Sequence, residues 1–362
     1  MRIAAYNVEN LFARVVAMNA DNAAGRAPLE AYAALNQLVA KPSYSAADRA
    51  AMLRHLETLG LLNADNGPLA RLRSNQGKLL RRPRQGTPEI IAAGRDDWEG
   101  WVELEREPVD SIARRLTARV IDDVGADVIG VVEAESRPSL AAFNALLAVP
   151  YAQVMLIDGN DARGIDVALM SRAAHPILNM RSHVDLQDAV GPVFSRDCPA
   201  YQVDAPGGPI TVLVNHLKSK GFGRPADSNR KRQRQAEAIA GIYRDLIAAG
   251  QDRVVVLGDM NDTPDSAPLA PLLTGTDLRD ISTLPAHADG GFAGTYGGSG
   301  ARNKIDYILL SPALASKVRG SGVFRSGMWP GVRPRKWAAY PEMLTETNAA
   351  SDHAALWVDL EL

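Results

Sequence analysis

The stretch VVVLGDMNDTP (residues 254–264) begins as an apolar run that suits a buried strand and ends in polar side chains. Polar groups are costly to bury inside a sheet, but a cleft at the edge of the sheet can use them. Asp259 and Asn261 are therefore candidates for functional groups at a strand end. If they form part of a site, other strands should end in the same way.

Several other apolar runs carry polar residues where they begin or end. Asn7 and Glu9 follow residues 3–6, Glu133 and Glu135 follow 127–132, and His216 follows 210–215, whereas Asp166, Asp306, Ser351, Asp352 and His353 precede the runs 167–170, 307–310 and 354–358. If the second group of strands runs opposite to the first in mixed sheets, all the polar ends meet at one edge. A single Asp or Asn at a strand end is more often a turn former, but turns have no need for Glu or His.

Helical patterns lie between some of these strands. Apolar residues recur at helical spacing over 109–124, where Gly125 is placed to end the helix, and over 236–247 before Gly250. This alternation predicts an α/β or α+β sandwich.

Residues 13–107 differ from the rest and are expected to form a mainly helical, partly basic insertion after the first strand, within a single domain spanning 1–362. Ser45 and Asp48 make a capping box for a helix over 46–59 that Gly60 ends. Its second half, RLRSNQGKLLRRPRQG (71–86), contains six basic residues and no acid. Such a run is either a solvated surface or a contact for phosphate.

The composition excludes several classes of protein. Lys plus Arg number 40 against 42 Asp plus Glu, so any attraction to phosphate must be local. The single cysteine, Cys198, rules out an intramolecular disulfide and a multi-thiolate metal site. No apolar run approaches the roughly 20 residues that span a bilayer, and no leader follows Met1. We expect a cytoplasmic protein without a membrane segment, or a secreted one if a leader has been removed.

The polar inventory favours metal-assisted hydrolysis of a phosphate ester. Carboxylates and amides are hard ligands that suit Mg²⁺ or Mn²⁺, and the sequence has no zinc-protease motif. Two histidines with carboxylate partners can transfer protons near neutral pH. There is no nucleotide-binding GxxxxGK[ST] loop and no GxSxG serine-hydrolase motif.

Seven motifs follow one another along the chain: YNVENLF (6–12), DVIGVVEAES (127–136), RGIDVALMSR (163–172), VNHLKSKG (214–221), VVLGDMNDTP (255–264), KIDYILLSP (304–312) and SDHAAL (351–356). In this order they resemble the motifs of the endonuclease/exonuclease/phosphatase superfamily, and VNHLKSKG and RGIDVAL are most similar to the motifs of bacterial secreted-type DNases. The resemblance covers residues 1–12 and about 109–362. It implies a four-layer α/β/β/α sandwich of two mixed sheets with the active site at one edge.

The resemblance also implies a metal site. Glu133 matches the principal Mg²⁺ ligand, with Asn7, Glu9 and Asp352 as direct or water-mediated ligands. Val132 departs from the family, which usually has Gln before this Glu.

By the same resemblance, His353 activates water or contacts the scissile phosphate, and Asp306 orients it. Asp259 handles a proton, and Asn261 holds the nucleophile or a phosphate oxygen. The assignment of acid and base is left open.

Two further motifs bear on the substrate. His216 matches a second histidine, a candidate acid for the leaving oxygen, with Asp166 as its expected partner. Arg163 and Lys218 are expected to contact the phosphate. More basic residues follow the His216 motif, either as contacts for a polyanion or as a solvated helix surface: Lys220, Arg224, Arg230, Lys231, Arg232 and Arg234.

These observations predict a Mg²⁺-dependent (or Mn²⁺-dependent) nuclease whose partner is nucleic acid, with DNA expected over RNA. An alternative is a phosphatase or phosphodiesterase acting on a lipid headgroup or a small nucleotide ester. A third interpretation is a binding module that does not turn over substrate. The presence of all the expected catalytic side chains argues against it.

Overall fold

The computed structural model describes residues 1–18, 22–161, 163–220, 224–332 and 334–362. The chain divides into two compact units. The sandwich unit comprises residues 1–12, 109–220 and 225–362, and the insertion unit comprises residues 13–108. Each unit is described by itself.

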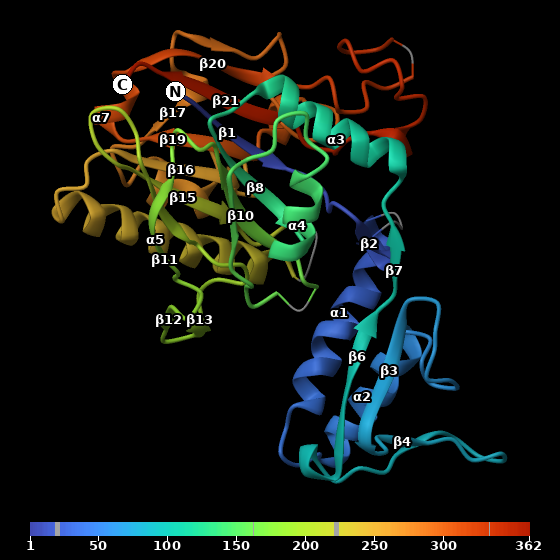
Figure 1. Cartoon of the computed structure of the whole chain (residues 1–362). Helices are drawn as coiled ribbons and strands as arrows, with labels where there is room; N and C mark the ends of the chain where they lie inside the picture. The colour runs from blue at the N-terminus through green and yellow to red at the C-terminus, as the bar shows by residue number, and fades with distance from the viewer. Residues whose placement is uncertain (19–21, 162, 221–223, 333) are drawn as a thin grey trace. The chain divides into compact units, whose positions relative to one another are not determined.

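The sandwich unit contains two large mixed sheets (Figure 1). The seven-stranded sheet has, in spatial order, β18 (His287–Ala288), β20 (Val318–Phe324), β21 (Ala355–Leu360), β1 (Arg2–Asn7), β8 (Val128–Ala134), β10 (Asp166–Ser171) and β9 (Gln153–Leu156). The six-stranded sheet has β11 (Ile177–Arg181), β14 (Ala200–Val203), β15 (Ile210–His216), β16 (Val254–Asp259), β19 (Asp306–Leu310) and β17 (Arg279–Asp280). All seven apolar runs identified in the sequence lie in these sheets.

Helices cover the outer face of each sheet. In the sandwich unit they are α3 (Ser111–Val124), α4 (Arg137–Asn144), α5 (Pro225–Ala248), α6 (Ala270–Leu273) and α7 (Pro312–Ala315). The α3 helix begins at Asp110, whose carboxylate accepts hydrogen bonds from two backbone amides, and ends at Gly125 in the left-handed region (φ 60°), as the sequence predicts. None of the helices in the described part of the chain is both long and apolar enough to cross a membrane.

The alternation of side chains along each strand explains the layers. In β1, Ala4 and Tyr6 pack with residues of α3 and α4, whereas Ile3 and Ala5 face the other sheet. In β16, Val255 and Leu257 face the first sheet, and the intervening valines pack against α5. Strands buried on both faces read as continuous apolar runs, which is why the sequence shows them clearly. The order helix, sheet, sheet, helix confirms the expected four-layer sandwich.

The insertion unit has its own apolar core and is mixed rather than mainly helical. Its helices are α1 (Asn22–Val39) and α2 (Ala46–Thr58), and α2 has the predicted capping box between Ser45 and Asp48. Its strands are β2 (Ala13–Val15), β3 (Ala70–Gly77), β4 (Leu80–Arg81), β5 (Glu89–Ile90), β6 (Trp98–Leu104) and β7 (Arg106–Pro108). The expectation was wrong for the second half, where β3 and β6 pair as a hairpin that buries alternate residues.

The basic run at 71–86 pairs largely with acids that lie elsewhere in the sequence. Arg71 and Arg73 contact Glu105 and Glu103 across the hairpin, Arg81 contacts Glu89, and Arg82 contacts Asp65. These ion pairs favour the interpretation of the run as a solvated surface.

Candidate active site

The strand directions bring the predicted polar residues to one edge of the sandwich. The strand β1 is parallel to β8, and β15 is parallel to β16, whereas β10, β19 and β21 are antiparallel to their neighbours in these groups. In the six-stranded sheet Asp259 therefore lies beside both His216 and Asp306. The carboxyl ends of one set of strands and the amino ends of the other form a common rim, as the sequence argument requires.

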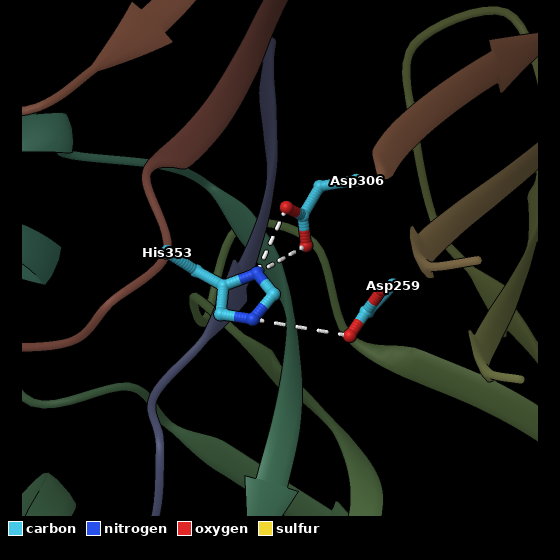
Figure 2. Close-up of side chains that lie close together, drawn as sticks. All are labelled: Asp259, Asp306 and His353. Carbon is cyan, nitrogen blue, oxygen red and sulfur yellow. Dashed lines mark hydrogen bonds and ion pairs between the residues drawn. The ribbon is translucent and has the colours of Figure 1, made fainter. Parts of the chain in front are cut away.

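His353 and Asp306 form a buried hydrogen-bonded pair (Figure 2). The Nδ1 atom of His353 lies 2.9 Å from Oδ2 of Asp306, and Thr295 Oγ1 donates to the same oxygen over 2.6 Å. Burial alone would lower the pKa of His353, but the charge of Asp306, followed by that of Asp352, raises the pKa well above its usual range. The imidazole is therefore held in its charged form.

Asp259 lies between the two histidines. Its Oδ2 atom is 4.0 Å from Nε2 of His353 and 3.6 Å from Nε2 of His216, and it accepts a hydrogen bond from the Asn7 amide over 3.3 Å. Burial, followed by the negative charge of Asp306, raises the pKa of Asp259 to about 8. A carboxylate with such a pKa can take up a proton near neutral pH.

Asn261 holds Asp259 in place. Its backbone amide donates to Oδ1 of Asp259 over 2.8 Å, and its side-chain nitrogen donates to Oδ2 of Asp259 over 3.0 Å and to the Leu217 carbonyl over 3.1 Å. A phosphate contact through this nitrogen would replace the bond to Leu217.

His216 is neutral, in contrast to His353. Burial, followed by the positive charges of Arg196 and Arg163, lowers the pKa of His216 well below its usual range. Arg196 donates to its Nε2 atom over 3.0 Å, which requires a lone pair on that nitrogen. In this state His216 accepts a proton rather than donating one from Nε2, so the expected role as an acid does not fit.

The expected pairing of His216 with Asp166 is also wrong. Oδ1 of Asp166 accepts a hydrogen bond from the Gly159 amide over 2.8 Å, and the carboxylates nearest to Nε2 of His216 are those of Glu133 and Asp259, each at 3.6 Å. Asp166 starts β10, one strand beyond β8, whereas His216 lies in the other sheet. Burial raises the pKa of Asp166 to about 6.

Three cations gather on the His216 side of the site. Arg163 and Arg196 both contact Asp161, through ion pairs of 2.7 and 3.4 Å. Burial, followed by the charges of Arg163 and Arg196, lowers the pKa of Lys218 to about 8. A phosphate bound here would be stabilised by the two guanidiniums and the ammonium.

Oxygen donors also surround the site. The pKa of the Tyr296 phenol is raised, first by the charge of Asp352, then by burial, and then by the charges of Glu9, Asp259 and Glu133. The negative charges of four carboxylates therefore act on the same part of the site. A divalent cation would neutralise this charge, and oxygen donors are the ligands that Mg²⁺ and Mn²⁺ prefer. The donor set of Glu133, Glu9 and Asp352 thus fits the expected ion.

Asn7 can add a neutral donor to this set. Its side-chain nitrogen points to Asp259 and lies 3.4 Å from Nε2 of His353, and its Oδ1 accepts the Glu9 amide over 3.0 Å. Glu9 in turn accepts the backbone amide of Asp352 over 3.0 Å. Three of the four predicted metal-binding residues, Asn7, Glu9 and Asp352, are therefore linked by hydrogen bonds, and Glu133 lies beside His216.

A second group of potential ligands is better explained by proton chemistry. Asp259, Asp306 and His353 each offer one atom within 4.8 Å of the others. The Nδ1 atom of His353 is already bonded to Asp306, and the carboxylates of Asp306 and Asp259 flank the imidazole on its two nitrogen sides. We therefore interpret this group as proton-handling.

Three of the site residues have left-handed backbone conformations. The φ angles are 50° at Glu9, 68° at Glu133 and 54° at Asn261. Such conformations cost about 1–3 kcal/mol each and occur often at functional sites. At Glu133 the cause is a bulge, because Asp166 pairs with Ala134 and Val167 with Val132, which leaves Glu133 unopposed.

Helix α5 fixes the backbone of Lys218. Arg232, which is fully buried, donates to the Lys218 carbonyl over 2.6 Å and to Oδ2 of Asp262 over 2.8 Å, and Gln235 accepts the Lys218 amide over 2.8 Å. Arg230 pairs with Asp227 at the surface. The basic stretch at the start of α5 is therefore partly structural rather than a row of phosphate contacts.

The sequence analysis missed three residues of the site, Arg196, Thr295 and Tyr296, and it named Ser351 without giving it a role. Ser351 donates to the Asn7 carbonyl over 2.7 Å and accepts the His353 amide over 3.0 Å. Arg196 lies in a loop before β14 and carries no local signal, because only the fold brings it to His216. Thr295 and Tyr296 lie in a glycine-rich segment that reads as a plain loop.

Solved structures with similar folds share little sequence with this chain. An endonuclease/exonuclease/phosphatase family protein from Bacteroides thetaiotaomicron aligns with TM-score 0.51 and 16% identity, over 68% of this chain and 86% of that one. A mannosyl-6-phosphatase from Bacteroides thetaiotaomicron VPI-5482 aligns with TM-score 0.51 and 18% identity, over 69% and 92%. At these identities the likeness concerns the fold. No curated protein matches the chain.

The sequence itself gives the stronger assignment. The profile of the Endonuclease/Exonuclease/phosphatase family matches residues 80–321, a range that includes Glu133, Asp166, His216, Asp259 and Asp306. The chain belongs to the endonuclease/exonuclease/phosphatase family.

Proposed function

We propose that this protein is a divalent-metal-dependent phosphodiesterase that hydrolyses nucleic acid and acts as a DNA endonuclease. The observation that carries the proposal is that carboxylates and cations meet at one buried site. The charges of Asp352, Glu9, Asp259 and Glu133 act on Tyr296, those of Arg196, Arg163 and Lys218 act on His216, and Glu133 and Asp259 each lie 3.6 Å from Nε2 of His216. A phosphodiester bound here would meet both a cation held by the carboxylates and the neighbouring guanidiniums.

We assign the metal to Glu133, Asn7, Glu9 and Asp352. When bound, Mg²⁺ or Mn²⁺ would polarise a phosphoryl oxygen and neutralise charge that develops at phosphorus. The remaining roles belong to the side chains of the protein.

Asp259 would accept the proton of the attacking water. Its raised pKa and its place between the two imidazoles suit it to this role. His353, held charged by Asp306, would donate a hydrogen bond to the phosphate and then a proton to the leaving oxygen. His216 accepts a hydrogen bond from Arg196 and would thereby hold that guanidinium beside the phosphate.

A single panel of substrates tests the proposal. Wild-type protein and the His353→Ala variant would be incubated with supercoiled plasmid, single-stranded DNA, RNA and phosphomonoesters, each with Mg²⁺, Mn²⁺ or EDTA. We expect the wild-type protein to nick and linearise plasmid with either metal, and EDTA or the substitution to stop cleavage. Turnover of the monoesters alone would instead identify a phosphatase acting on a lipid headgroup or a small nucleotide ester, which the same side chains would serve.

A further inference from the structure

Beside the catalytic residues lies a set of exposed basic side chains: Arg302, Arg335 and Lys336, here called the basic patch. We infer that the basic patch binds backbone phosphates of the nucleic acid next to the scissile one. The inference rests on the proposed nuclease function and names a part of the substrate that this function leaves undefined.

The segment 294–303 connects the catalytic residues to the basic patch. Thr295 donates to Asp306, and the ring of Tyr296 lies against the imidazole of His353, with ring centroids 4.8 Å apart. The Gly297 amide donates to the Asp352 carbonyl over 2.8 Å. One side of this segment therefore contacts the catalytic pair and a proposed metal-binding residue.

The other side of the same segment carries the basic patch. Lys336 Nζ donates to the Gly298 carbonyl over 2.8 Å, and Arg335 is its neighbour in the chain. Arg302 precedes Asn303, whose side-chain nitrogen donates to the Tyr296 carbonyl over 3.1 Å. All three basic residues are thus attached to the segment that contacts His353.

Distances along the chain set how far the basic patch lies from the chemistry. Gly298 is two residues from Tyr296, so their Cα atoms are at most about 7–8 Å apart. A nucleic-acid strand rises by about 3.4 Å per nucleotide. The basic patch is thus placed to reach phosphates within a few nucleotides of the cleaved bond.

The residues on either side of Lys336 are held by contacts of their own. The Lys336 amide donates to the Pro330 carbonyl over 3.0 Å, and Trp337 Nε1 donates to the Met328 carbonyl over 3.2 Å. The Trp337 ring also packs edge-on against Phe292, with centroids 5.4 Å apart. The backbone at Lys336 and Trp337 is therefore placed before a ligand binds.

Arg325 holds the start of the segment 294–303, which the basic patch contacts. This buried guanidinium donates to the Asp289 and Gly294 carbonyls over 2.6 and 2.7 Å and also bonds to the Phe292 carbonyl. Its hydrogen bonds fix the start of the segment that leads to Thr295.

Some basic residues of the sandwich unit are neutralised by acidic partners, whereas, within the described part of the chain, the basic patch is not. Arg2, Arg119, Arg234 and Arg319 all form ion pairs with carboxylates. Among the residues that the structure describes, none places a carboxylate within ion-pairing distance of Arg302, Arg335 or Lys336. Three positive charges beside a phosphodiesterase site are free to bind a polyanion, and charge complementarity of this kind gives most of the affinity for a nucleic-acid backbone.

The test removes the three charges together. The triple variant Arg302→Ala, Arg335→Ala, Lys336→Ala would be compared with a matched control, Arg181→Ala, Arg279→Ala, Lys317→Ala, which removes three exposed charges elsewhere on the sandwich unit. Binding of a labelled duplex of about 20 base pairs would be measured by fluorescence anisotropy between about 50 and 200 mM salt. Both variants would carry His353→Ala so that the duplex stays intact.

We expect the basic-patch variant to bind the duplex roughly 10-fold more weakly, and the slope of log affinity against log salt to fall by up to about 0.9 for each lost contact. With His353 restored, the ratio of kcat/KM of the basic-patch variant for plasmid to that for a small phosphodiester should fall, whereas the control variant should keep the wild-type ratio.

If the basic-patch variant keeps the wild-type salt slope while the wild-type protein cleaves plasmid, only the inference about the basic patch is overturned. Loss of binding to phosphatidylserine vesicles with unchanged DNA affinity would also overturn it, in favour of a membrane surface. A wild-type protein that neither binds nor cleaves DNA would overturn the proposed function as well.

Discussion

The Nδ1 atom of His353 lies 2.9 Å from Oδ2 of Asp306, although 47 positions separate the two residues in the chain. Both side chains are buried, and Thr295 donates a further hydrogen bond to the same carboxylate oxygen. A buried carboxylate beside an imidazole favours the charged form of the imidazole. This pair therefore sets the protonation state of the histidine that faces Asp259.

Replacing Asp306 should remove the charge that keeps His353 protonated, and activity should fall with it. In Asp306→Asn the pKa of His353 should fall, because burial then dominates, and the imidazole should lose its proton as the pH rises through this lower pKa. We expect kcat to drop by about 10²- to 10⁴-fold at neutral pH, and less at acidic pH. The measurement is kcat against pH with the substrate that the panel identifies.

Thr295→Val provides a graded control for this substitution. It keeps the carboxylate and removes only one hydrogen bond, which is worth about 0.5–1.5 kcal/mol. Its kcat should fall by roughly 10-fold or less, with a pH profile close to that of the wild type. A profile in Asp306→Asn that matches the wild type would show that His353 is not the group that titrates.

The Arg232–Asp262 pair should matter for stability more than any basic residue at the helix surface. Both side chains are buried, and Arg232→Met leaves the Asp262 carboxylate with Lys220, whose ammonium is about half exposed, so the free energy of unfolding should fall by up to about 3–5 kcal/mol. Arg230→Met removes an exposed pair and should cost about 1 kcal/mol or less. Urea denaturation of the two variants gives the comparison, and equal losses would argue against a buried charge.

The strands were predictable because their apolar runs are buried on both faces, and the site could be predicted because its polar residues end those runs. Asn7, Glu133, His216 and Asp259 meet at the edge that the strand directions define. The hairpin of the insertion unit was not predictable in the same way. Arginines on its outer face interrupt the apolar pattern, and their acidic partners lie in a different part of the sequence.

The details of the site depend on contacts that no local pattern encodes. Arg196 and His216 are 20 residues apart, and the charge of Arg196 adds to burial in lowering the pKa of His216. The bulge at Glu133 likewise depends on its pairing with β10, so the sequence suggested a strand that ends at residue 132. Such features follow from tertiary packing, whereas the pattern of apolar residues follows from burial alone.

Asp166 should make stability depend on pH in an unusual direction. Its folded-state pKa of about 6 lies above the ordinary value of 3.8, so the folded protein holds this proton more tightly than the unfolded chain. Ionisation of Asp166 therefore opposes folding as the pH rises from about 4 to 6. Asp166→Asn should gain stability relative to the wild type over this range and keep the gain at higher pH. The measurement is the difference in free energy of unfolding at several pH values, and a difference that does not change with pH would contradict the raised pKa.

Glu133 provides the sharpest test of the proposed metal site. In Glu133→Gln a negative ligand becomes neutral while its size is kept, so the Mg²⁺ concentration that gives half-maximal activity should rise by at least about 10-fold. A calorimetric titration of Mn²⁺ into the substrate-free protein should show the same loss of affinity. Glu237→Gln, on the exposed face of α5, serves as the matched control and should bind metal as the wild type does. Equal metal affinities for the wild type and Glu133→Gln would remove Glu133 from the ligand set, and cleavage of plasmid in EDTA would remove the metal from the proposed reaction.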